Sequence, residues 1–487
     1  MVCGTTSDAG KSVVVAGLCR LLARDGVRVA PFKAQNMALN SFVTAAGHEI
    51  GRAQASQAFA ARAQPEVAMN PILLKPTGDQ ASQVIVNGIP IGHLRAAEYH
   101  ARKPELLSVV LDALADLRSR FDVVVCEGAG SPAEINLLDR DIVNLRIAHE
   151  AGFPAIVVGD IDRGGVFAAL YGTVALLPEH LRLCVRGFLL NMLRGDPTLL
   201  GDGPAELERR CGVPTLGVLP FTPGITIDAE DSLALDRPWP TAGAPLAEPL
   251  DIAVVRLPRV SNITDLDPLR LEPGVTVRLV SHASQLGAPD LVVIPGSKAT
   301  VSDLAWLRAT GFDEALRATP AMVLGICGGA QMLGRDITDD IESRAGTVAG
   351  LGLLDLTTTF HPDKVTRQRT GIVMGETVRG YQIHHGRLTV GADAEPWVHL
   401  DGEEEEGAVE LTEARVLATT LHGLFEADGF RVTFLTELGR RAGKTFVPAG
   451  VKFHDARDAQ AELLADLLAE HADVEALLAL IASGVPA

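Results

Sequence analysis

The sequence has few aromatic residues, no paired-cysteine motif and too few basic residues to balance its acidic ones. Aromatic side chains make up 4% of the 487 residues, and the six cysteines are scattered without a CxxC pair. This spacing argues against a disulfide framework or a zinc knuckle. The net charge of −18 argues against a nucleic-acid partner, which requires an excess of Lys and Arg. An anionic substrate must therefore meet a local basic pocket.

The chain also lacks a long hydrophobic run. The uncharged apolar run Val166 to Leu177 is too short to span a bilayer. A phosphate-loop pattern occupies the first residues, where a signal peptide would lie. We therefore expect a cytoplasmic protein without a membrane partner, and the sequence leaves a homo-oligomer open. The length exceeds what one hydrophobic core usually holds, so two or more domains are expected.

Short Val- and Ile-rich runs alternate with Ala- and Leu-rich helical stretches along the chain. This alternation is typical of a parallel sheet wrapped in helices. In the first half the predicted strands are Phe121–Cys126, Pro154–Gly159 and Arg186–Asn191. A second series follows, with predicted strands at Asp251–Leu257, Asp290–Ile294 and Met322–Ile326. We expect an α/β fold class with two domains.

Composition marks the boundaries between these parts. The segment 236–249 reads DRPWPTAGAPLAEP and carries four prolines, which favours a linker. The tail after Asp455 has helical apolar spacing, and the acidic run Glu403–Glu406 is expected in a solvated loop. We predict a first domain over 1–235, a linker over 236–250, a second domain over 251–445 and a C-terminal helical tail over 446–487.

A phosphate-binding loop lies between a short apolar run and a helical stretch at the start of the chain. It reads Gly4-Thr5-Thr6-Ser7-Asp8-Ala9-Gly10-Lys11-Ser12. Backbone N–H groups of such a loop surround phosphates at a helix N-terminus. Lys11 is expected to reach the terminal phosphates of ATP, and the Ser12 hydroxyl to bind Mg²⁺. The glycines are one residue further apart than in GxxxxGK[ST], and this spacing resembles the loop of the dethiobiotin synthetase group.

Acidic side chains at two predicted strand ends are candidate Mg²⁺ ligands. Glu127 closes one apolar run, and Asp160 and Asp162 close another. Each could be an ordinary turn residue, but the carboxyl ends of parallel strands meet at the edge of the sheet where the phosphate loop lies. The coincidence of two such ends favours metal binding.

A nucleophile motif lies in the second half of the chain, where Gly325-Ile326-Cys327-Gly328-Gly329-Ala330-Gln331 ends a predicted strand and opens a helix. The small neighbours permit the sharp turn that exposes a nucleophile, and the positive end of the helix favours a thiolate. The Gly328 N–H is expected to stabilise an oxyanion. A second donor is expected from the turn Pro295-Gly296-Ser297-Lys298, at Gly296. The other five cysteines are expected to be structural.

A base for this thiol must come from elsewhere in the fold. His422, in Thr420-Leu421-His422-Gly423, follows a strand-like run and therefore lies where a base is required. His384 and His385, in the motif GYQIHHG, are the competing candidates. We prefer His422.

The elbow and the later histidine resemble the triad class of glutamine amidotransferases. Many members place a glutamate two residues after the histidine, where this chain has Leu424. Two alternatives remain for the third member of the triad. Glu426 serves in that place, or the site works as a Cys–His pair.

Further blocks along nearly the whole chain are similar to the cobyric acid synthase family. They read PFKAQNMALNS at 31–41, NPILLKP at 70–76, EGAGSP at 127–132, DIDRGG at 160–165, LPRVSN at 257–262 and GYQIHHG at 380–386. The sister family amidates the a and c carboxylates of the corrin ring. The first of these blocks and the early phosphate loop favour cobyric acid synthases. A phosphate-loop switch protein with a vestigial glutaminase domain is an alternative from another class.

The resemblance implies both fold and activity. The first domain would be a dethiobiotin-synthetase-like ATP-binding amide synthetase with a parallel sheet, and the second a class I, triad-type glutamine amidotransferase domain. The family uses ATP, Mg²⁺ and glutamine to amidate the b, d, e and g carboxylates of adenosylcobyrinic acid a,c-diamide, a corrinoid of cobalamin biosynthesis. Candidate contacts to ATP or the corrinoid are Lys33, Gln35, Asn36, Asn40 and Lys75; alternatively, these residues cap helices or brace loops.

Overall fold

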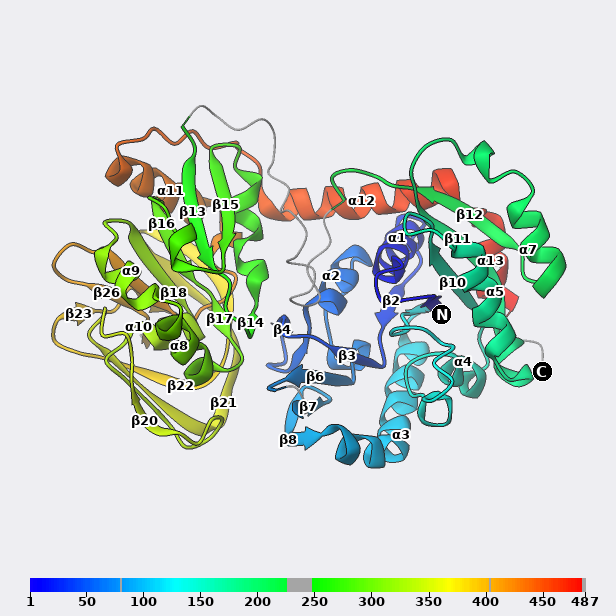
Figure 1. The fold of residues 1–487 in the computed structure, drawn as a ribbon, viewed down its shortest axis with the longest axis horizontal. Helices are drawn as coiled ribbons and strands as arrows, with labels where there is room; N and C mark the ends of the chain where they lie inside the picture. Colours follow the sequence, from blue (N-terminus) through cyan, green and yellow to red (C-terminus); the bar gives the residue numbers. More distant parts are fainter. Residues whose placement is uncertain (79–80, 226–247, 403, 484–487) are drawn as a thin grey trace.

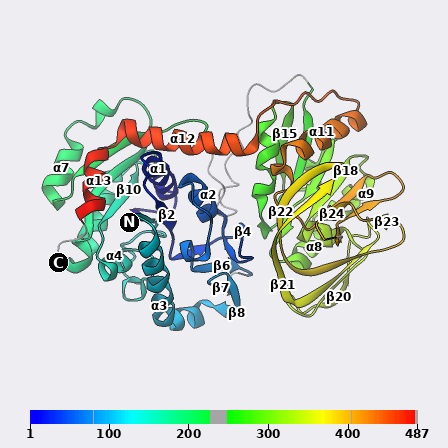
Figure 2. The same ribbon diagram turned by 180° about the vertical axis from the view of Figure 1, so that it is seen from behind.

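The computed structural model describes residues 1–78, 81–225, 248–402 and 404–483. Two α/β lobes lie side by side and are bridged by a long helix (Figures 1 and 2). This arrangement confirms the predicted fold class. Most of the predicted linker, at 236–247, lies outside the described residues. No helix of the described part is both long and apolar enough to traverse a bilayer.

The N-terminal lobe is built on parallel strands. Four of them form one sheet in the order β1 (Val2–Gly4), β10 (Ala155–Asp160), β11 (Val185–Leu193) and β12 (Thr215–Pro220). The parallel pair β2 (Val29–Phe32) and β9 (Val123–Cys126) extends this sheet through a bridge between Val2 and Glu127. The phosphate-loop strand β1 therefore lies between β9 and β10. The three strands predicted in this half are β9, β10 and β11.

Helices cover this sheet. They are α1 (Lys11–Arg24), α2 (Arg52–Ala60), α3 (Ala96–Arg120), α4 (Leu145–Ala151), α5 (Val166–Leu176), α6 (Glu179–Arg182) and α7 (Gly203–Cys211). A smaller sheet lies on the side that faces the other lobe, with β3 (Gln35–Met37), β6 (Ile72–Pro76), β7 (Ala81–Val86) and β8 (Ile89–Arg95). The hairpin β4 (Ser41–Val43) and β5 (Glu49–Gly51) extends towards the C-terminal lobe.

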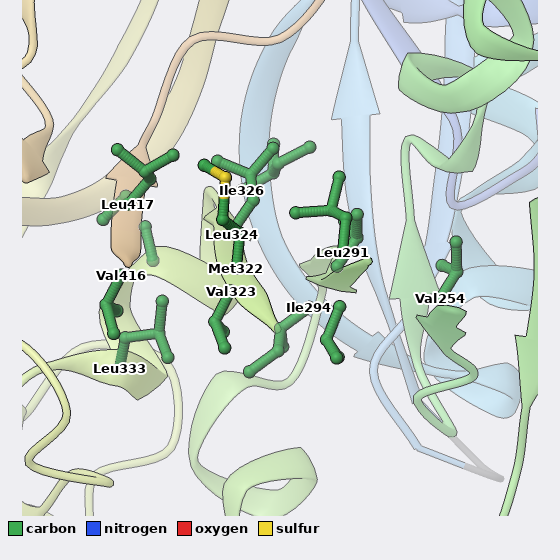
Figure 3. Packing of buried hydrophobic residues seen from close by; sticks show 14 of the residues in the cluster. Val254, Leu291, Ile294, Met322, Val323, Leu324, Ile326, Leu333, Val416 and Leu417 are labelled. Atoms are coloured by element: carbon green, nitrogen blue, oxygen red, sulfur yellow. The ribbon is translucent and has the colours of Figure 1, made fainter. Parts of the chain in front are cut away.

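The C-terminal lobe has a seven-stranded sheet. Its order is β15 (Val275–Val280), β13 (Leu250–Val255), β16 (Leu291–Ile294), β18 (Met322–Ile326), β27 (Val416–Thr419), β26 (Ala408–Glu410) and β23 (Ala394–Glu395). The first five strands are parallel. All five residues of β18 are buried, which explains its continuous apolar sequence. Figure 3 shows the packing of its side chains against those of β16 and β27.

A second sheet of this lobe contains the long hairpin β21 (Leu356–Val373) and β22 (Glu376–Val390). Its other strands are β19 (Asp336–Asp339), β20 (Gly346–Ala349), β24 (Val398–Leu400) and β25 (Glu404–Glu406). The short strands β14 (Val260–Ser261) and β17 (Gly296–Ser297) pair with each other. The helices of this lobe are α8 (Thr300–Ala309), α9 (Phe312–Ala318), α10 (Gly328–Leu333) and α11 (Asp428–Ala442).

The acidic run at 403–406 was predicted as a solvated loop. In its described part, Glu404 and Glu405 are exposed as predicted, but Glu404–Glu406 form a strand and Glu406 is buried. The side chains of Thr419 and Thr420 donate hydrogen bonds to its carboxylate, at 2.7 Å each. These donors compensate for the loss of water around the Glu406 side chain.

The tail is helical, with α12 (Phe453–His471) and α13 (Val474–Ser483). Helix α12 starts on the C-terminal lobe, where the Phe453 N–H donates to Asp428 (2.9 Å). It then packs along α1, where the buried Arg20 contacts Glu462 at 2.9 Å. Helix α13 completes an apolar cluster of the N-terminal lobe through Leu477. The chain thus returns to the lobe where it began (Figure 1).

Candidate active site

Cys327 occupies a strained turn between β18 and α10. Its backbone has φ +51° and ψ −108°, a conformation that non-glycine residues rarely adopt. Its N–H donates to the Thr419 carbonyl on the neighbouring strand β27 (2.7 Å). A Cβ atom on Gly329 would lie 1.9 Å from the Ile294 carbonyl oxygen, so the helix start can approach β16 only with glycine there. These constraints produce the nucleophile elbow that the sequence predicted.

His422 follows β27, the strand next to β18, and is buried. Its Nδ1 lies 2.7 Å from Oδ2 of Asp265, and the Gly423 N–H donates to Oδ1 of the same carboxylate (2.9 Å). Its backbone pairs with that of Tyr381, whose ring stacks on the imidazole at a centroid distance of 5.3 Å. The ring therefore has a fixed orientation, with Nδ1 directed to a carboxylate.

Charge around His422 favours its protonated form. Burial by itself would lower the pKa of His422, but the Asp265 carboxylate and then the Cys327 sulfur outweigh it and raise this pKa to about 10. Within the described part of the chain, Nε2 of His422 has no hydrogen-bond partner. His422 and Cys327 line the same cavity. The thiol of Cys327 thus shares its cavity with an imidazole that is held in its protonated form.

Asp265 is the residue that the sequence did not reveal. It lies in a 3₁₀ segment, Ile263–Leu271, about 157 residues before His422. Glu426, one of the two alternatives, forms an ion pair with Arg52 of the N-terminal lobe instead (2.9 Å). The one available signal was the position of Asp265, three residues after the LPRVSN block.

The predicted oxyanion glycines also lie at this turn. A Cβ atom on Gly328 would lie 2.8 Å from the Ser297 nitrogen, and one on Gly296 would lie 3.4 Å from Cε1 of His422. Gly328 thus lies against the β17 turn, and Gly296 beside the base.

The cavity beside Cys327 has an empty volume of about 440 Å³. Side chains of both lobes line it. They are Lys75, Ser261, Asn262, Ser297, Lys298, Thr300, Cys327, Gln331, Glu342, Phe360, Lys364, Ile383, His384, His385 and His422. All three lysines of its wall are ion-paired, Lys298 with Glu342 and both Lys75 and Lys364 with Glu49. The wall thus carries paired charges of both signs.

Lys75 and Asn40 lie at the junction between the lobes. Lys75 comes from β6, and its Nζ lies 2.7 Å from Glu49 and 2.9 Å from the Ser41 hydroxyl. Lys364 of the C-terminal lobe contacts the same Glu49 at 2.6 Å. The Asn40 side chain accepts a hydrogen bond from the N–H of Ile263 (3.2 Å). The structure thus places both residues near the cavity of Cys327, although they were predicted to contact ATP or the corrinoid.

The phosphate loop joins β1 to α1. Nζ of Lys11 donates to the carbonyls of Thr6 (2.8 Å) and Ser7 (2.9 Å), and the Thr5 N–H bonds to Val158 on β10. Gly4 ends β1. Gly10 has φ +103°, and a Cβ atom there would lie 2.0 Å from the side-chain nitrogen of Asn191. The loop therefore takes the compact form that brings backbone N–H groups to a helix start.

Glu127 is the centre of a buried polar cluster beside this loop. Its carboxylate accepts hydrogen bonds from the Ser12 hydroxyl (3.0 Å), from Lys33 (3.0 Å) and from Gln57. Burial would raise the pKa of Glu127, but the Lys33 ammonium and these hydrogen bonds outweigh it and lower the pKa. A hydroxyl beside a carboxylate is an oxygen donor set that suits Mg²⁺.

The remaining predicted residues are spread over this lobe. Asp160 ends β10 and contacts Arg163 (3.3 Å), whereas the more exposed Asp162 contacts Arg194 (2.7 Å). The Asn36 side chain donates to Gln54 (2.8 Å), and Gln35 accepts from the Tyr99 hydroxyl. Among the described residues, no group of three or more His, Cys, Asp or Glu side chains could hold a metal ion. Ser12 and Glu127 are thus brought together, while Asp162 is engaged elsewhere.

Two family models match the chain. A nucleotide-binding domain of the CobQ/CobB/MinD/ParA type covers residues 1–234, and a CobB/CobQ-like glutamine amidotransferase domain covers residues 251–430. The first description agrees with the phosphate loop, and the second agrees with the site of Cys327 and His422.

Relatives match over the full length of the chain. The cobyric acid synthases of Nocardia farcinica, Frankia casuarinae and Streptomyces avermitilis are 53%, 51% and 51% identical, respectively. Each match covers 100% of this chain and 97% of the relative. These findings confirm the resemblance inferred from the sequence blocks. The chain belongs to the cobyric acid synthase family.

Proposed function

We propose that this chain is an ATP-dependent amide synthetase that takes its nitrogen from glutamine. The observation that carries the proposal is the Cys327–His422–Asp265 arrangement, which opens on a cavity shared with the phosphate-loop lobe. A nucleophile, a base and a carboxylate that orients the base form the arrangement that cleaves carboxamides. The N-terminal lobe, with its phosphate loop, supplies the place where ATP activates an acid.

The glutaminase half-reaction follows from this geometry. The Cys327 sulfur attacks the side-chain carbonyl carbon of glutamine, and the Gly328 and Gly296 region stabilises the oxyanion. Protonated His422 gives its proton to the departing nitrogen, so that the C–N bond breaks and ammonia leaves. His422 then takes a proton from water, which hydrolyses the thioester to glutamate. Asp265 is a positioning residue that holds the imidazole and stabilises its charge.

In the synthetase half we propose that Lys11 and the backbone of Gly4, Thr5, Thr6, Ser7 and Gly10 bind the phosphates of ATP. Ser12 and Glu127 would hold Mg²⁺, with Asp160 at the neighbouring strand end, and the metal would neutralise phosphate charge. Lys33 lies at the same cluster and would stabilise the acyl phosphate. A carboxylate oxygen of the acid attacks the γ-phosphorus of ATP, so that the acyl phosphate forms and ADP leaves. Ammonia then attacks the acyl phosphate, the amide forms and inorganic phosphate leaves.

For the acid we propose adenosylcobyrinic acid a,c-diamide, amidated at its b, d, e and g carboxylates. The support is the family membership and the full-length identity to proteins named cobyric acid synthase. We propose a cytoplasmic enzyme on small molecules without a nucleic-acid partner. Its six free cysteines fit a reducing compartment, and its net charge is −18.

The first test separates the two nitrogen sources. Cys327→Ala should lower glutamine-driven amidation by roughly 10⁵-fold, because a nucleophile is lost. Amidation driven by added ammonium chloride should stay within about twofold, because the synthetase lobe is unchanged. Cys211→Ala, which removes a thiol that donates to the Leu207 carbonyl of its own helix, should change neither rate. Loss of both activities in folded Cys327→Ala protein would contradict the two-centre scheme.

The second test concerns the acid. With ATP and ammonium chloride, cobyrinic acid and its a,c-diamide are compared as substrates, and the amides formed are counted by mass spectrometry. We expect four amidations of the a,c-diamide. Activity on cobyrinic acid alone would assign the chain to the a,c-amidating sister reaction.

A further inference from the structure

His384 is a buried side chain in the glutaminase cavity that the mechanism above does not use. It belongs to β22 and to the GYQIHHG motif, and it is 8% exposed. It lines the same cavity as Cys327 and His422. Gly386, two residues after His384, packs against Gln331, which lies one helical turn after Cys327. The ring thus stands near the elbow.

The hydrogen bonds of His384 determine its tautomer. Nδ1 lies 2.7 Å from the Gly386 carbonyl oxygen, which can only accept, so Nδ1 carries the proton. Burial lowers the pKa of His384 to about 3, so the ring stays neutral. Nε2 must then be an acceptor with a free lone pair, and within the described part of the chain it has no donor.

A buried acceptor without a donor is costly unless a ligand supplies one. The ligand of this cavity under the proposed function is glutamine, which carries two kinds of N–H group. The α-ammonium is better matched to a carboxylate, and Glu342, which Lys298 also contacts, lines the same cavity. The carboxamide NH₂ must lie at Cys327, because the sulfur attacks the carbon that bears it. This group is the donor that fits a neutral acceptor near the elbow.

We propose that Nε2 of His384 accepts a hydrogen bond from the carboxamide N–H of glutamine and so selects glutamine over glutamate. The side-chain carboxylate of glutamate has no hydrogen to donate and would place its own lone pairs against Nε2. A site built to bind an N–H group strongly rejects an analogue without one. The same contact favours the release of glutamate after hydrolysis. This inference rests on the proposed glutaminase activity.

The test removes the acceptor from the protein and the donor from the substrate. His384→Phe keeps a flat ring but lacks the acceptor, and kcat/KM for glutamine hydrolysis should fall about 10- to 100-fold. With the γ-methyl ester of glutamate, which has no N–H at this position, the same variant should stay within about threefold of the unmodified chain. His384→Gln, whose side-chain oxygen can approach the position of Nε2, should restore part of the loss for glutamine.

His385→Phe is the matched control. His385 lines the same cavity and also bonds a backbone carbonyl, that of His361 (2.9 Å), so it shares the environment. His385→Phe should change kcat/KM for the amide and for the ester by the same factor. Equal losses for amide and ester in His384→Phe, or no loss at all, would overturn the role of His384.

Glutaramate, which lacks the α-ammonium, separates the two N–H groups. The loss in His384→Phe should persist with this substrate, and its disappearance would assign Nε2 to the ammonium and overturn the proposal. Ammonium-driven amidation by the same preparations reports folding. Absence of glutamine turnover in the unmodified chain would instead overturn the proposed function and this inference together.

Discussion

The two reactive groups of the molecule, the thiol of Cys327 and the ammonium of Lys11, are held in different ways. The thiol is fixed by backbone geometry, with a positive φ, a glycine packed against β16 and a backbone hydrogen bond to β27. The ammonium is held at the end of a flexible side chain by carbonyl oxygens of its own loop. The thiol is therefore preorganised before any ligand binds. Lys11 must exchange these carbonyl partners for phosphate oxygens.

This difference predicts which substitutions act on one reaction and which act on both. A change at the Cys327 centre should affect only the use of glutamine. A change at the phosphate loop should affect amidation with either nitrogen source. The following predictions run from the largest effect to the smallest.

Asp265→Asn should lower glutamine-driven amidation by on the order of 10³- to 10⁴-fold, because an amide cannot orient and stabilise the His422 imidazolium as a carboxylate does. Ammonium-driven amidation should remain within about twofold. Steady-state rates with each nitrogen source measure both effects. Glu426→Gln is the control, since Glu426 pairs with Arg52 and not with His422. A glutamine-specific loss of similar size in Glu426→Gln would assign the third place to that residue.

Asp265→Asn should also change the pH dependence of glutamine hydrolysis. His422 is charged below its pKa, which Asp265 and Cys327 raise from 6.5 to about 10, so activity should persist into alkaline solution. Removal of the carboxylate charge lowers this pKa, so the alkaline loss of activity should move to lower pH. For stability, the raised pKa of His422 contributes fully below pH 6.5, and the contribution disappears as the pH rises through about 10. An unchanged alkaline limb in Asp265→Asn would exclude this electrostatic role.

Lys11→Met should lower amidation with glutamine and with ammonium alike, by about 10²- to 10³-fold, because a cation at the transferring phosphoryl group is lost. Glutamine hydrolysis by itself should change far less. The comparison uses ATP consumption and glutamate formation in the same samples. A loss of amidation with glutamine but not with ammonium would place the role of Lys11 at the Cys327 centre and contradict the proposal.

Cys327→Gly should unfold at a higher temperature than Cys327→Ala, with a difference of about 1 kcal/mol in the free energy of unfolding. Both variants lack the thiol, but only alanine retains the Cβ atom that makes a positive φ unfavourable. Thermal unfolding of the two proteins measures the strain stored at the elbow. Equal stability would show that the elbow is held without strain.

The sequence predicted the parts of the fold that local patterns encode. Buried strands such as Met322–Ile326 read as continuous apolar runs, and the elbow and phosphate loop consist of neighbouring residues with defined spacing. The roles of the predicted site residues remain proposals that the experiments above address. The domain boundaries also remain predictions.

The contributions that no pattern predicted are those made by distant segments. Asp265 lies far from His422 in the chain, and its position shortly after the LPRVSN block does not identify it as a partner of a histidine. Lys75 stands in a block that the resemblance linked to substrate binding, and only the packing of the two lobes brings it to the cavity of Cys327. The sequence predicted a solvated charge at Glu406, because the hydroxyl donors of Thr419 and Thr420 that bond its carboxylate follow 13 and 14 residues later.

Helix α12 returns the chain to the N-terminal lobe, and this return determines how the two lobes are connected. Because α12 and α13 complete the packing around α1 and β12, the glutaminase lobe is in effect an insertion within the synthetase lobe. An inserted domain is tethered at both of its ends, whereas an appended one swings from a single hinge. Cleavage of the backbone between residues 225 and 248 would therefore leave the C-terminal fragment bound to the N-terminal lobe through α12 and α13.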